Sequence, residues 1–288
     1  MAVVVFGLKN KNMKLKKIKS FVVIIKNKLF STFSIMGKVK YQKFFEWLNK
    51  LSLTGMNVGT GEKISKSGEI KVLKHINKHF KSSNNLILFD VGANIGNYSI
   101  ILNKIFNKKA KIHSFEPSKN IYKKLLTKLG NEENIFLYNF GFGNKNEKKP
   151  LYSNPDRLRL TSIYKRKLDH FNIDMNQKEE VEIKTIDSFC KENNIQHINF
   201  LKLDVEGHEK KILEGSREMI DSKNIDFIQF EFGGCNIDSR TYFQNFYYLL
   251  KDKYKIYRIM RDGLYEIKQY KETYEIFITT NYLAEKII

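Results

Sequence analysis

The chain has 288 residues, of which 42% are hydrophobic and 13% aromatic, and its formal net charge is +20. This composition excludes a chain that is disordered throughout, because it supplies enough apolar side chain for a buried core. No uninterrupted apolar run approaches the roughly 18 residues that a transmembrane helix needs. The two cysteines, Cys190 and Cys235, are too few for a disulfide scaffold and predict a reduced, cytoplasmic setting.

The positive charge is concentrated at the start of the chain, where residues 1–50 form a basic arm with twelve lysines and one acid, Glu46. The arm therefore contributes +11 of the net charge. Its apolar residues between 15 and 30 have helical spacing. Three interpretations follow: a helix packed on the main domain, a helix lying on the anionic inner face of a membrane, and a contact with nucleic acid.

Two further parts follow the arm, a lead-in helical segment over 51–85 and a main domain over 86–288. In the main domain, short apolar runs alternate with amphipathic helices. The expected strands are 86–90, 111–116, 135–139, 181–183, 198–204 and 227–231. The expected helices, including one in the lead-in segment, are 68–80, 97–106, 119–129, 185–190, 208–220 and 241–251. The alternation predicts a parallel, doubly wound sheet.

Two segments depart from this alternation. Residues 144–178 are polar and irregular, and we expect a surface excursion there. Residues 255–260 and 274–280, on either side of a turn at Asp262-Gly263, are expected to form a terminal hairpin. The hairpin would place at least one antiparallel strand at the edge of the sheet.

The strongest motif is the loop Asp90-Val91-Gly92-Ala93-Asn94-Ile95-Gly96, which follows an apolar strand and opens a helix. Gly92 and Gly96 allow the backbone to turn tightly and to approach a ligand closely. The loop is neither GxGxxG nor a Walker loop, which indicates a ligand without a pyrophosphate to bind. Asp90 ends the strand, and we expect it to order the loop and face a cationic group such as an α-ammonium.

The second motif is Phe115-Glu116-Pro117, at the end of the next strand. An acid at the tip of this strand is placed to accept hydrogen bonds from the two hydroxyls of a ribose. Pro117 would fix the turn that follows. Glu116 is therefore predicted to bind a ribose.

The third motif is Leu203-Asp204-Val205-Glu206-Gly207-His208-Glu209, after an apolar strand. In an open α/β sheet, ligands bind beyond the carboxyl ends of the strands, where these acids would lie. Carboxylates this close together raise each other's pKa unless a cation or donor intervenes. His208 and Glu209 are equally explained by the first turn of a helix, where an acid favours the positive end of the dipole.

These three motifs together resemble the FkbM family of S-adenosylmethionine-dependent methyltransferases, over roughly residues 55–281. The resemblance implies an α/β, Rossmann-like class I methyltransferase fold. This fold has a mostly parallel seven-stranded sheet with an antiparallel C-terminal strand, and helices on both faces. It implies S-adenosylmethionine as the cofactor, bound by Asp90, Gly92, Ala93, Asn94, Gly96, Glu116, Pro117, Asn139 and Gly141.

The resemblance also implies O-methylation of a hydroxyl. We expect the acceptor to be a sugar in a glycan or glycolipid precursor, with a small natural-product hydroxyl as an alternative. Asp204, Glu206 and His208 are the candidate catalytic residues, and Glu231, at the end of the fifth strand, is a further candidate base. A divalent metal at Asp204 and Glu231 is an alternative, because carboxylates at neighbouring strand ends suit Mg²⁺. It is not the expected arrangement, because Phe232 follows Glu231 where metal-dependent relatives of this fold carry a second carboxylate.

The main competing function is an RNA methyltransferase that uses the basic arm to contact nucleic acid. Three acids at the predicted site would repel phosphates, so a nucleic-acid partner is not expected. A module that only binds the cofactor would not need the acidic cluster, and an oxidoreductase would need GxGxxG. Five residues of the excursion are candidates to face a sugar or a phosphate: Tyr152, Arg157, Arg159, Tyr164 and Arg166.

Overall fold

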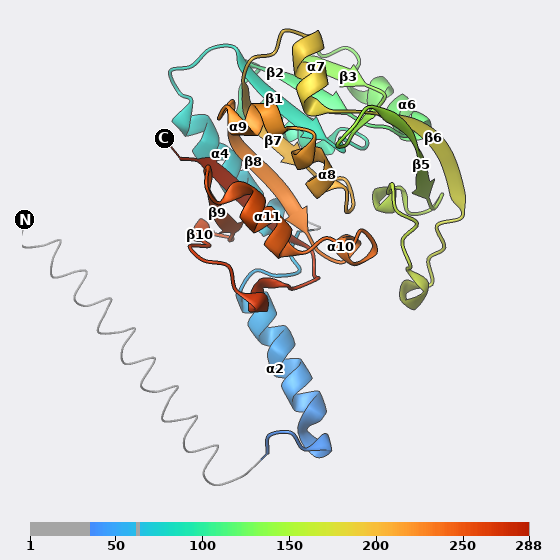
Figure 1. Cartoon of the computed structure of the whole chain (residues 1–288), viewed down its shortest axis with the longest axis vertical. Helices are drawn as coiled ribbons and strands as arrows, with labels where there is room; N and C mark the ends of the chain where they lie inside the picture. The colour runs from blue at the N-terminus through green and yellow to red at the C-terminus, as the bar shows by residue number, and fades with distance from the viewer. Residues whose placement is uncertain (1–34, 62–63, 288) are drawn as a thin grey trace, which may run out of the picture. The chain divides into compact units, whose positions relative to one another are not determined.

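The computed structural model describes residues 35–61 and 64–287, and the chain divides into two units, 1–53 and 54–288 (Figure 1). In the described part of the first unit, helix α2 begins at Gln42 and continues to Gly55, after a short 3-10 turn at Val39–Tyr41. The helix predicted between residues 15 and 30 lies outside the described residues. Within the described part of the chain, no helix is both long enough and apolar enough to cross a membrane.

The second unit is built on an eight-stranded sheet with the order β10-β9-β11-β8-β7-β1-β2-β3. The five strands β3, β2, β1, β7 and β8 are parallel to one another, and β11 runs antiparallel between β8 and β9. The bounds of the strands are β1 (Leu86–Val91), β2 (Ala110–Phe115), β3 (Ile135–Tyr138), β7 (Ile198–Leu203), β8 (Ile225–Phe232), β9 (Tyr254–Ile259), β10 (Leu264–Glu266) and β11 (Thr280–Lys286). The predicted doubly wound, mostly parallel sheet is confirmed.

The prediction of the terminal hairpin was wrong in its second strand. The tight turn at Asp262-Gly263 joins β9 directly to β10, whose Leu264 pairs with Ile259. Residues 272–274 form a 3-10 turn instead, and the chain returns as β11 in the interior of the sheet. The described sheet therefore has eight strands rather than seven. Buried residues on both faces of β11, such as Tyr282 and Leu283, give it the pattern of an interior strand.

Helices cover both faces of the sheet, because successive residues of a strand point to opposite sides. Leu88 of β1 belongs to the core shared with α4, α5 and α6, whereas Phe89 belongs to the core shared with α7, α8, α9 and α11. The bounds of the helices are α3 (Ile64–Ser67), α4 (Glu69–His79), α5 (Asn97–Ile105), α6 (Lys119–Leu129), α7 (Ile186–Glu192), α8 (Glu209–Glu214), α9 (Arg217–Asp221), α10 (Cys235–Asp238) and α11 (Phe243–Leu250).

The helix predicted over 208–220 is divided into α8 and α9. The division falls at Gly215, where a Cβ atom would lie 1.9 Å from the carbonyl oxygen of Gly143. Helical periodicity continues across this point, so the sequence pattern does not reveal the close approach of a distant backbone.

The lead-in segment packs against the main sheet and is hydrogen-bonded to it. Val72, Leu73 and Ile76 of α4 are buried in the core with β1 and β2. Ahead of the helix, the side-chain amide of Asn57 donates to the carbonyl oxygens of Ser67 at 2.8 Å and Ile259 at 2.9 Å. Helix α4 is thus part of the second unit.

The predicted surface excursion, residues 144–178, contributes β5 to a small sheet with the order β4-β6-β5, whose other two strands flank it in sequence. Its strands are β4 (Gly141–Phe142), β5 (Glu147–Ser153) and β6 (Gln177–Lys184). Only Leu151, Val181 and Ile183 form its buried core, and opposite charges such as Lys148 and Glu180 pair across β5 and β6. A hairpin this polar has little hydrophobic alternation, which is why the sequence predicted irregular structure for most of it.

Candidate active site

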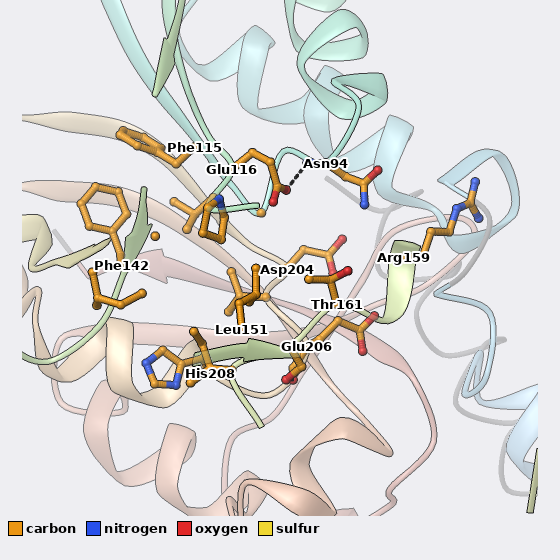
Figure 2. Close-up of a pocket in the computed structure, with 18 of the residues that line it drawn as sticks. Asn94, Phe115, Glu116, Phe142, Leu151, Arg159, Thr161, Asp204, Glu206 and His208 are labelled. Carbon is orange, nitrogen blue, oxygen red and sulfur yellow. Dashed lines mark hydrogen bonds between the residues drawn. The ribbon is translucent and has the colours of Figure 1, made fainter. Parts of the chain in front are cut away.

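A pocket open to solvent lies beyond the carboxyl ends of β1, β2 and β7 and beneath the excursion (Figure 2), with about 580 Å³ of empty space that includes its open mouth. This is the edge at which an open parallel sheet binds ligands. Of the predicted site residues, eight line the pocket: Gly92, Asn94, Glu116, Pro117, Gly141, Asp204, Glu206 and His208. The excursion contributes Leu151, Leu158, Arg159, Thr161, Ser162 and Ile163.

Glu116 stands at the tip of β2 and is only 4% exposed. Its two carboxylate oxygens accept hydrogen bonds from the backbone N–H of Asn94 at 3.0 Å and of Ser118 at 2.9 Å, the first of which is drawn in Figure 2. Burial raises the pKa of Glu116 to about 7, although these two donors favour the charged form. Each oxygen keeps a lone pair for a donor in the pocket, as a ribose diol requires.

The two glycines of the first motif serve mainly the packing of the loop. Gly92 has φ +83°, and a Cβ atom there would lie 1.9 Å from the carbonyl oxygen of Asp204. A Cβ atom on Gly96 would lie 2.5 Å from the side chain of Leu129 on α6. Ala93 is buried in the core and, like Gly96, does not line the pocket. The loop therefore reaches the pocket through Gly92 and Asn94.

Asp90 does not face the pocket as predicted but is fully buried beneath it. One carboxylate oxygen accepts from the hydroxyl of Ser99 at 2.6 Å, and the other lies 3.7 Å from the Nζ atom of Lys202. Burial raises the pKa of Asp90, and the charge of Lys202 opposes that rise. Asp90 thus orders the loop from inside the sheet and is shielded from an α-ammonium group in the pocket.

Lys202 belongs to a polar row across the sheet, in which Asp90, Lys202 and Gln229 lie opposite one another on β1, β7 and β8. The side-chain amide of Gln229 donates to Glu69 of α4 at 2.7 Å and its oxygen accepts from the hydroxyl of Tyr98 at 3.0 Å. The Nζ atom of Lys202 lies 4.4 Å from the centre of the Tyr98 ring. This row connects the lead-in helix to the strand ends that carry the site.

Asn139 and Gly141, predicted near the adenine, have different roles. The side-chain amide of Asn139 donates to the carbonyl oxygens of Glu116 at 2.9 Å and Pro117 at 3.0 Å, and so fixes the turn after β2. Asn139 does not line the pocket. Gly141 does, and a Cβ atom there would lie 3.4 Å from the ring of Pro117.

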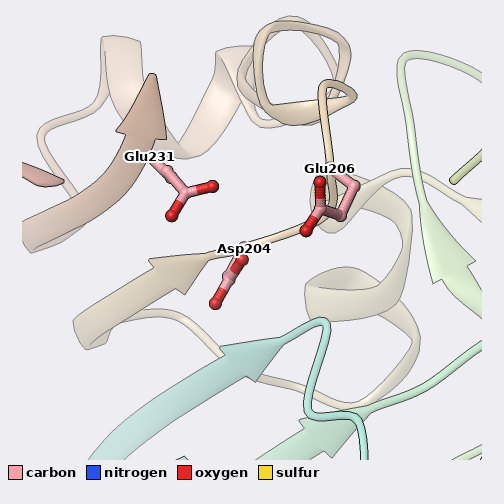
Figure 3. A group of neighbouring side chains, drawn as sticks. All are labelled: Asp204, Glu206 and Glu231. Carbon is pink, nitrogen blue, oxygen red and sulfur yellow. The ribbon is translucent and has the colours of Figure 1, made fainter. Parts of the chain in front are cut away.

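Three carboxylates, those of Asp204, Glu206 and Glu231, converge at the ends of β7 and β8 (Figure 3). One oxygen of each lies within 4.8 Å of the others. Burial raises the pKa of Glu231 well above its ordinary value, and repulsion from Asp204 and Glu206 raises it further. We call these three residues the acidic cluster.

Two basic side chains already neutralise part of the acidic cluster. The Nζ atom of Lys202 lies 2.9 Å from a carboxylate oxygen of Asp204, and the guanidinium of Arg166 pairs with Glu206. Glu231 has no hydrogen bond or ion pair to another side chain in the described part of the chain. Glu231 is therefore the carboxyl of the acidic cluster that is least neutralised by basic side chains among the described residues.

His208 lines the pocket, and its ring is held by a partner other than the acidic cluster. Its Nδ1 atom lies 3.1 Å from the hydroxyl of Tyr164, and its Nε2 atom is buried without a partner among the described residues. Burial, together with the positive charges of Lys149 and Lys211, lowers the pKa of His208 to about 4. His208 is therefore neutral at physiological pH.

Three side chains of the excursion, at residues 162, 164 and 166, contact the residues of this site. Every second side chain of an extended segment points to the same side, so the three contacts fit an extended backbone. The hydroxyl of Ser162 donates to the carbonyl oxygen of Glu206 at 2.8 Å, and Tyr164 and Arg166 contact the side chains of His208 and Glu206. Of the excursion residues predicted to face a ligand, Arg159 lines the pocket and is exposed, whereas Arg166 serves the docking.

Sequence reasoning missed Lys202 and the apolar wall formed by Phe142 and Ile183. A signal for Lys202 was present, since a lysine two residues before Asp204 in an otherwise apolar buried strand must have an anionic partner. Phe142 and Ile183 lie on different sides of the excursion in sequence, and only the pairing of β4 with β6 brings them together.

A family model described as "Methyltransferase FkbM domain" matches residues 90–266. The chain belongs to this family. It is an S-adenosylmethionine-dependent methyltransferase with a Rossmann-like class I fold. No curated protein matches the chain in sequence.

Several solved methyltransferases resemble this FkbM-domain protein weakly in structure. One is described as a putative rRNA-methylase from Clostridium thermocellum (11% identity, 75% of this chain and 96% of that one, TM-score 0.39). A second is a precorrin-6y C5,15-methyltransferase from Geobacter metallireducens (9% identity, 75% and 88%, TM-score 0.38). A third is fibrillarin from Aeropyrum pernix with bound S-adenosyl-L-methionine (12% identity, 70% and 66%, TM-score 0.38). Similarity this low identifies no acceptor.

The pocket of the FkbM-domain protein fits S-adenosylmethionine. The buried Glu116 carboxylate would hold the ribose hydroxyls, and Pro117, Phe142 and Ile183 would contact the adenine. The Nε2 atom of His208, which is buried without a hydrogen-bond partner among the described residues, adds a polar group to this apolar wall. When bound, S-adenosylmethionine supplies a methyl group activated by the positive sulfonium.

Proposed function

We propose that this methyltransferase acts on a hydroxyl oxygen, with a sugar of a glycan or glycolipid precursor as the acceptor. The observation that carries the proposal is the acidic cluster beside the cofactor pocket. Carboxylates are strong acceptors for hydroxyl donors, so Asp204, Glu206 and Glu231 can hold several hydroxyls of one sugar at once.

The same cluster supplies the base that O-methylation needs. A sugar hydroxyl is a poor nucleophile at neutral pH and must lose its proton as the new bond forms. Asp204 and Glu231, on neighbouring strands, can accept that proton, and the raised pKa of Glu231 strengthens its ionised carboxylate as a base. The lowered pKa of His208 makes its imidazole a weak base, so we assign the proton transfer to the carboxylates.

The chain's own residues also set the orientation of the acceptor. Lys202 holds one oxygen of Asp204 from within the sheet, while the Asp204 side chain is still 43% exposed toward the pocket. Arg166 fixes Glu206 from the excursion side. Holding the acceptor oxygen in line with the methyl group is the largest contribution that the protein makes to this displacement.

An RNA acceptor is disfavoured by the same geometry. The buried basic side chains near the site, Lys202 and Arg166, are already paired with carboxylates. The phosphates of a nucleic acid would be repelled by the carboxylate of Glu231, which has no basic partner among the described residues. The two cysteines, Cys190 and Cys235, are both buried and free, which supports our proposal of a cytoplasmic location.

The experiment supplies methyl-labelled S-adenosylmethionine and purified full-length protein to glycolipid, polysaccharide, RNA and small-molecule fractions of the host. We expect label in a carbohydrate fraction that survives mild base, as a methyl ether does and a methyl ester does not. Glu231→Gln should lower transfer at least about 100-fold while leaving cofactor affinity unchanged.

Glu180→Gln is the matched control, because Glu180 lies on β6 and forms an exposed ion pair with Lys148. It should transfer label at the normal rate. Label that enters RNA and is released by ribonuclease would overturn the sugar acceptor. Normal turnover by Glu231→Gln would remove Glu231 as the base.

A further inference from the structure

Helix α2 carries an apolar stripe that nothing in the described part of its unit covers. The stripe consists of Phe44, Trp47, Leu48 and Leu51, whose exposed fractions are 48%, 57%, 42% and 54%. Their spacing of three and four residues places them on one face of the helix. No residue of α2 is buried.

The opposite face of α2 is mainly polar, with Leu53 as an apolar residue near its end. Gln42, Glu46 and Asn49 lie there, and the side-chain amide of Gln42 donates to Glu46 at 3.0 Å. Lys43 and Lys50 flank the stripe on the side of Trp47, seven residues apart on the helix. The helix is therefore amphipathic, with lysines at the border between its two faces.

We propose that α2 lies on the surface of an anionic lipid bilayer, with the apolar stripe inserted among the headgroups. Tryptophan and phenylalanine are side chains that interfacial helices insert, and a bordering lysine such as Lys43 reaches lipid phosphates while its stem covers apolar surface. The basic arm of residues 1–50 adds a net charge of +11, which complements an anionic leaflet.

A second copy of the chain fits the stripe less well. Four half-exposed side chains of this size offer roughly 400 Å² per copy, about half of what each partner contributes to a stable interface. Two copies would also bring two arms of +11 together. Nucleic acid would use the lysines of the arm and leave the apolar stripe in water.

This proposal is independent of the acceptor. Lipid binding can be measured without any methyl transfer, so its failure and the failure of the proposed reaction are separate results. The sequence also supplies the probe, since Trp47 is the chain's single tryptophan and lies within the stripe.

The experiment follows the Trp47 emission of the full-length protein during titration with vesicles of 70% phosphatidylcholine and 30% phosphatidylglycerol. We expect a shift to shorter wavelength, quenching by brominated acyl chains, and reversal by salt. Vesicles of phosphatidylcholine alone should give much weaker binding. Lys43→Gln should raise the lipid concentration for half-binding about fivefold, the loss expected for one lysine near the surface.

Phe44→Ser tests the stripe while keeping the probe, and should weaken binding at least about tenfold. Leu126→Ser is its matched control, because Leu126 on α6 is also 48% exposed but lies in the second unit. Equal effects of the two substitutions, or no response to anionic vesicles, would overturn the proposal. So would an emission shift that needs only higher protein concentration, which would indicate a second copy, or one that appears only with RNA.

Discussion

The affinity of the methyltransferase for its cofactor should depend on pH through Glu116. Burial raises the pKa of this carboxyl to about 7 in the cofactor-free protein, so at pH 6 the group is about nine-tenths protonated. Ribose hydroxyls donate to the ionised form and favour it, so binding must release the proton. The affinity should therefore increase from pH 6 to pH 8 and then level off.

The size of the effect follows from the pKa. With a free pKa of about 7, and with the ordinary glutamate pKa of about 4.3 restored by the bound hydroxyls, the affinity at pH 6 is about tenfold weaker than at pH 8, equivalent to about 1.4 kcal/mol. Isothermal titration calorimetry with S-adenosylhomocysteine measures this directly. Repeating the titration in buffers of different ionisation enthalpy counts the released protons, which should approach one at pH 6.

Glu116→Gln separates this carboxyl from its neighbours. The amide cannot lose a proton, so the variant should bind more weakly at pH 8 and lose most of the pH dependence. The reasoning would be refuted by a wild-type affinity that is constant between pH 6 and pH 8. It would equally be refuted if Glu116→Gln kept the full slope, since another group, such as Glu209, would then be responsible.

Three predictions concern stability, measured by urea denaturation. Lys202→Met should lower the free energy of unfolding by about 3–5 kcal/mol, because it leaves Asp90 without its buried cation. Adding Asp90→Asn should restore part of the loss. A cost below about 1 kcal/mol for Lys202→Met alone would contradict the pairing. Gly92→Ala should cost more than about 2 kcal/mol because its Cβ meets a backbone carbonyl at positive φ. Gly263→Ala, whose Cβ meets nothing within 4 Å, should change stability by less than about 1 kcal/mol; equal costs would show that the loop adapts. Burial raises the pKa of Glu209 to about 7, so the folded cofactor-free protein binds protons more tightly than the unfolded chain. The free energy of unfolding should therefore fall between pH 5 and pH 8. A rise over that range would contradict the burial of this carboxyl in the folded protein.

Local patterns were sufficient for most of the framework. The predicted helix 119–129 has those bounds, since Ile121, Leu125 and Leu129 repeat at helical spacing and Gly130 follows. The alternation of apolar runs with amphipathic helices predicted the parallel sheet, and the strand-end position of Glu116 predicted its place at the pocket. These features depend on residues that are close together in sequence.

The features that sequence missed depend on contacts between distant residues. The division of the helix at Gly215 is set by the backbone at Gly143, and the place of β11 in the sheet is set by its pairing with β8 and β9. The pattern of 274–280 alone was compatible with a hairpin strand, because a strand's hydrophobic alternation does not identify its partner.

The sequence by itself determined that strand-end acids would gather at one edge of a parallel sheet, because parallel strands all end there. Only the tertiary structure decided what each acid does. Asp90 and Asp204 both follow apolar runs, and both lie near Lys202. Asp90, opposite Lys202 in the sheet, is fully buried, whereas Asp204 is partly exposed to the pocket. Burial and the nearest charge set the pKa and the access of a carboxyl, and both are properties of the packed protein.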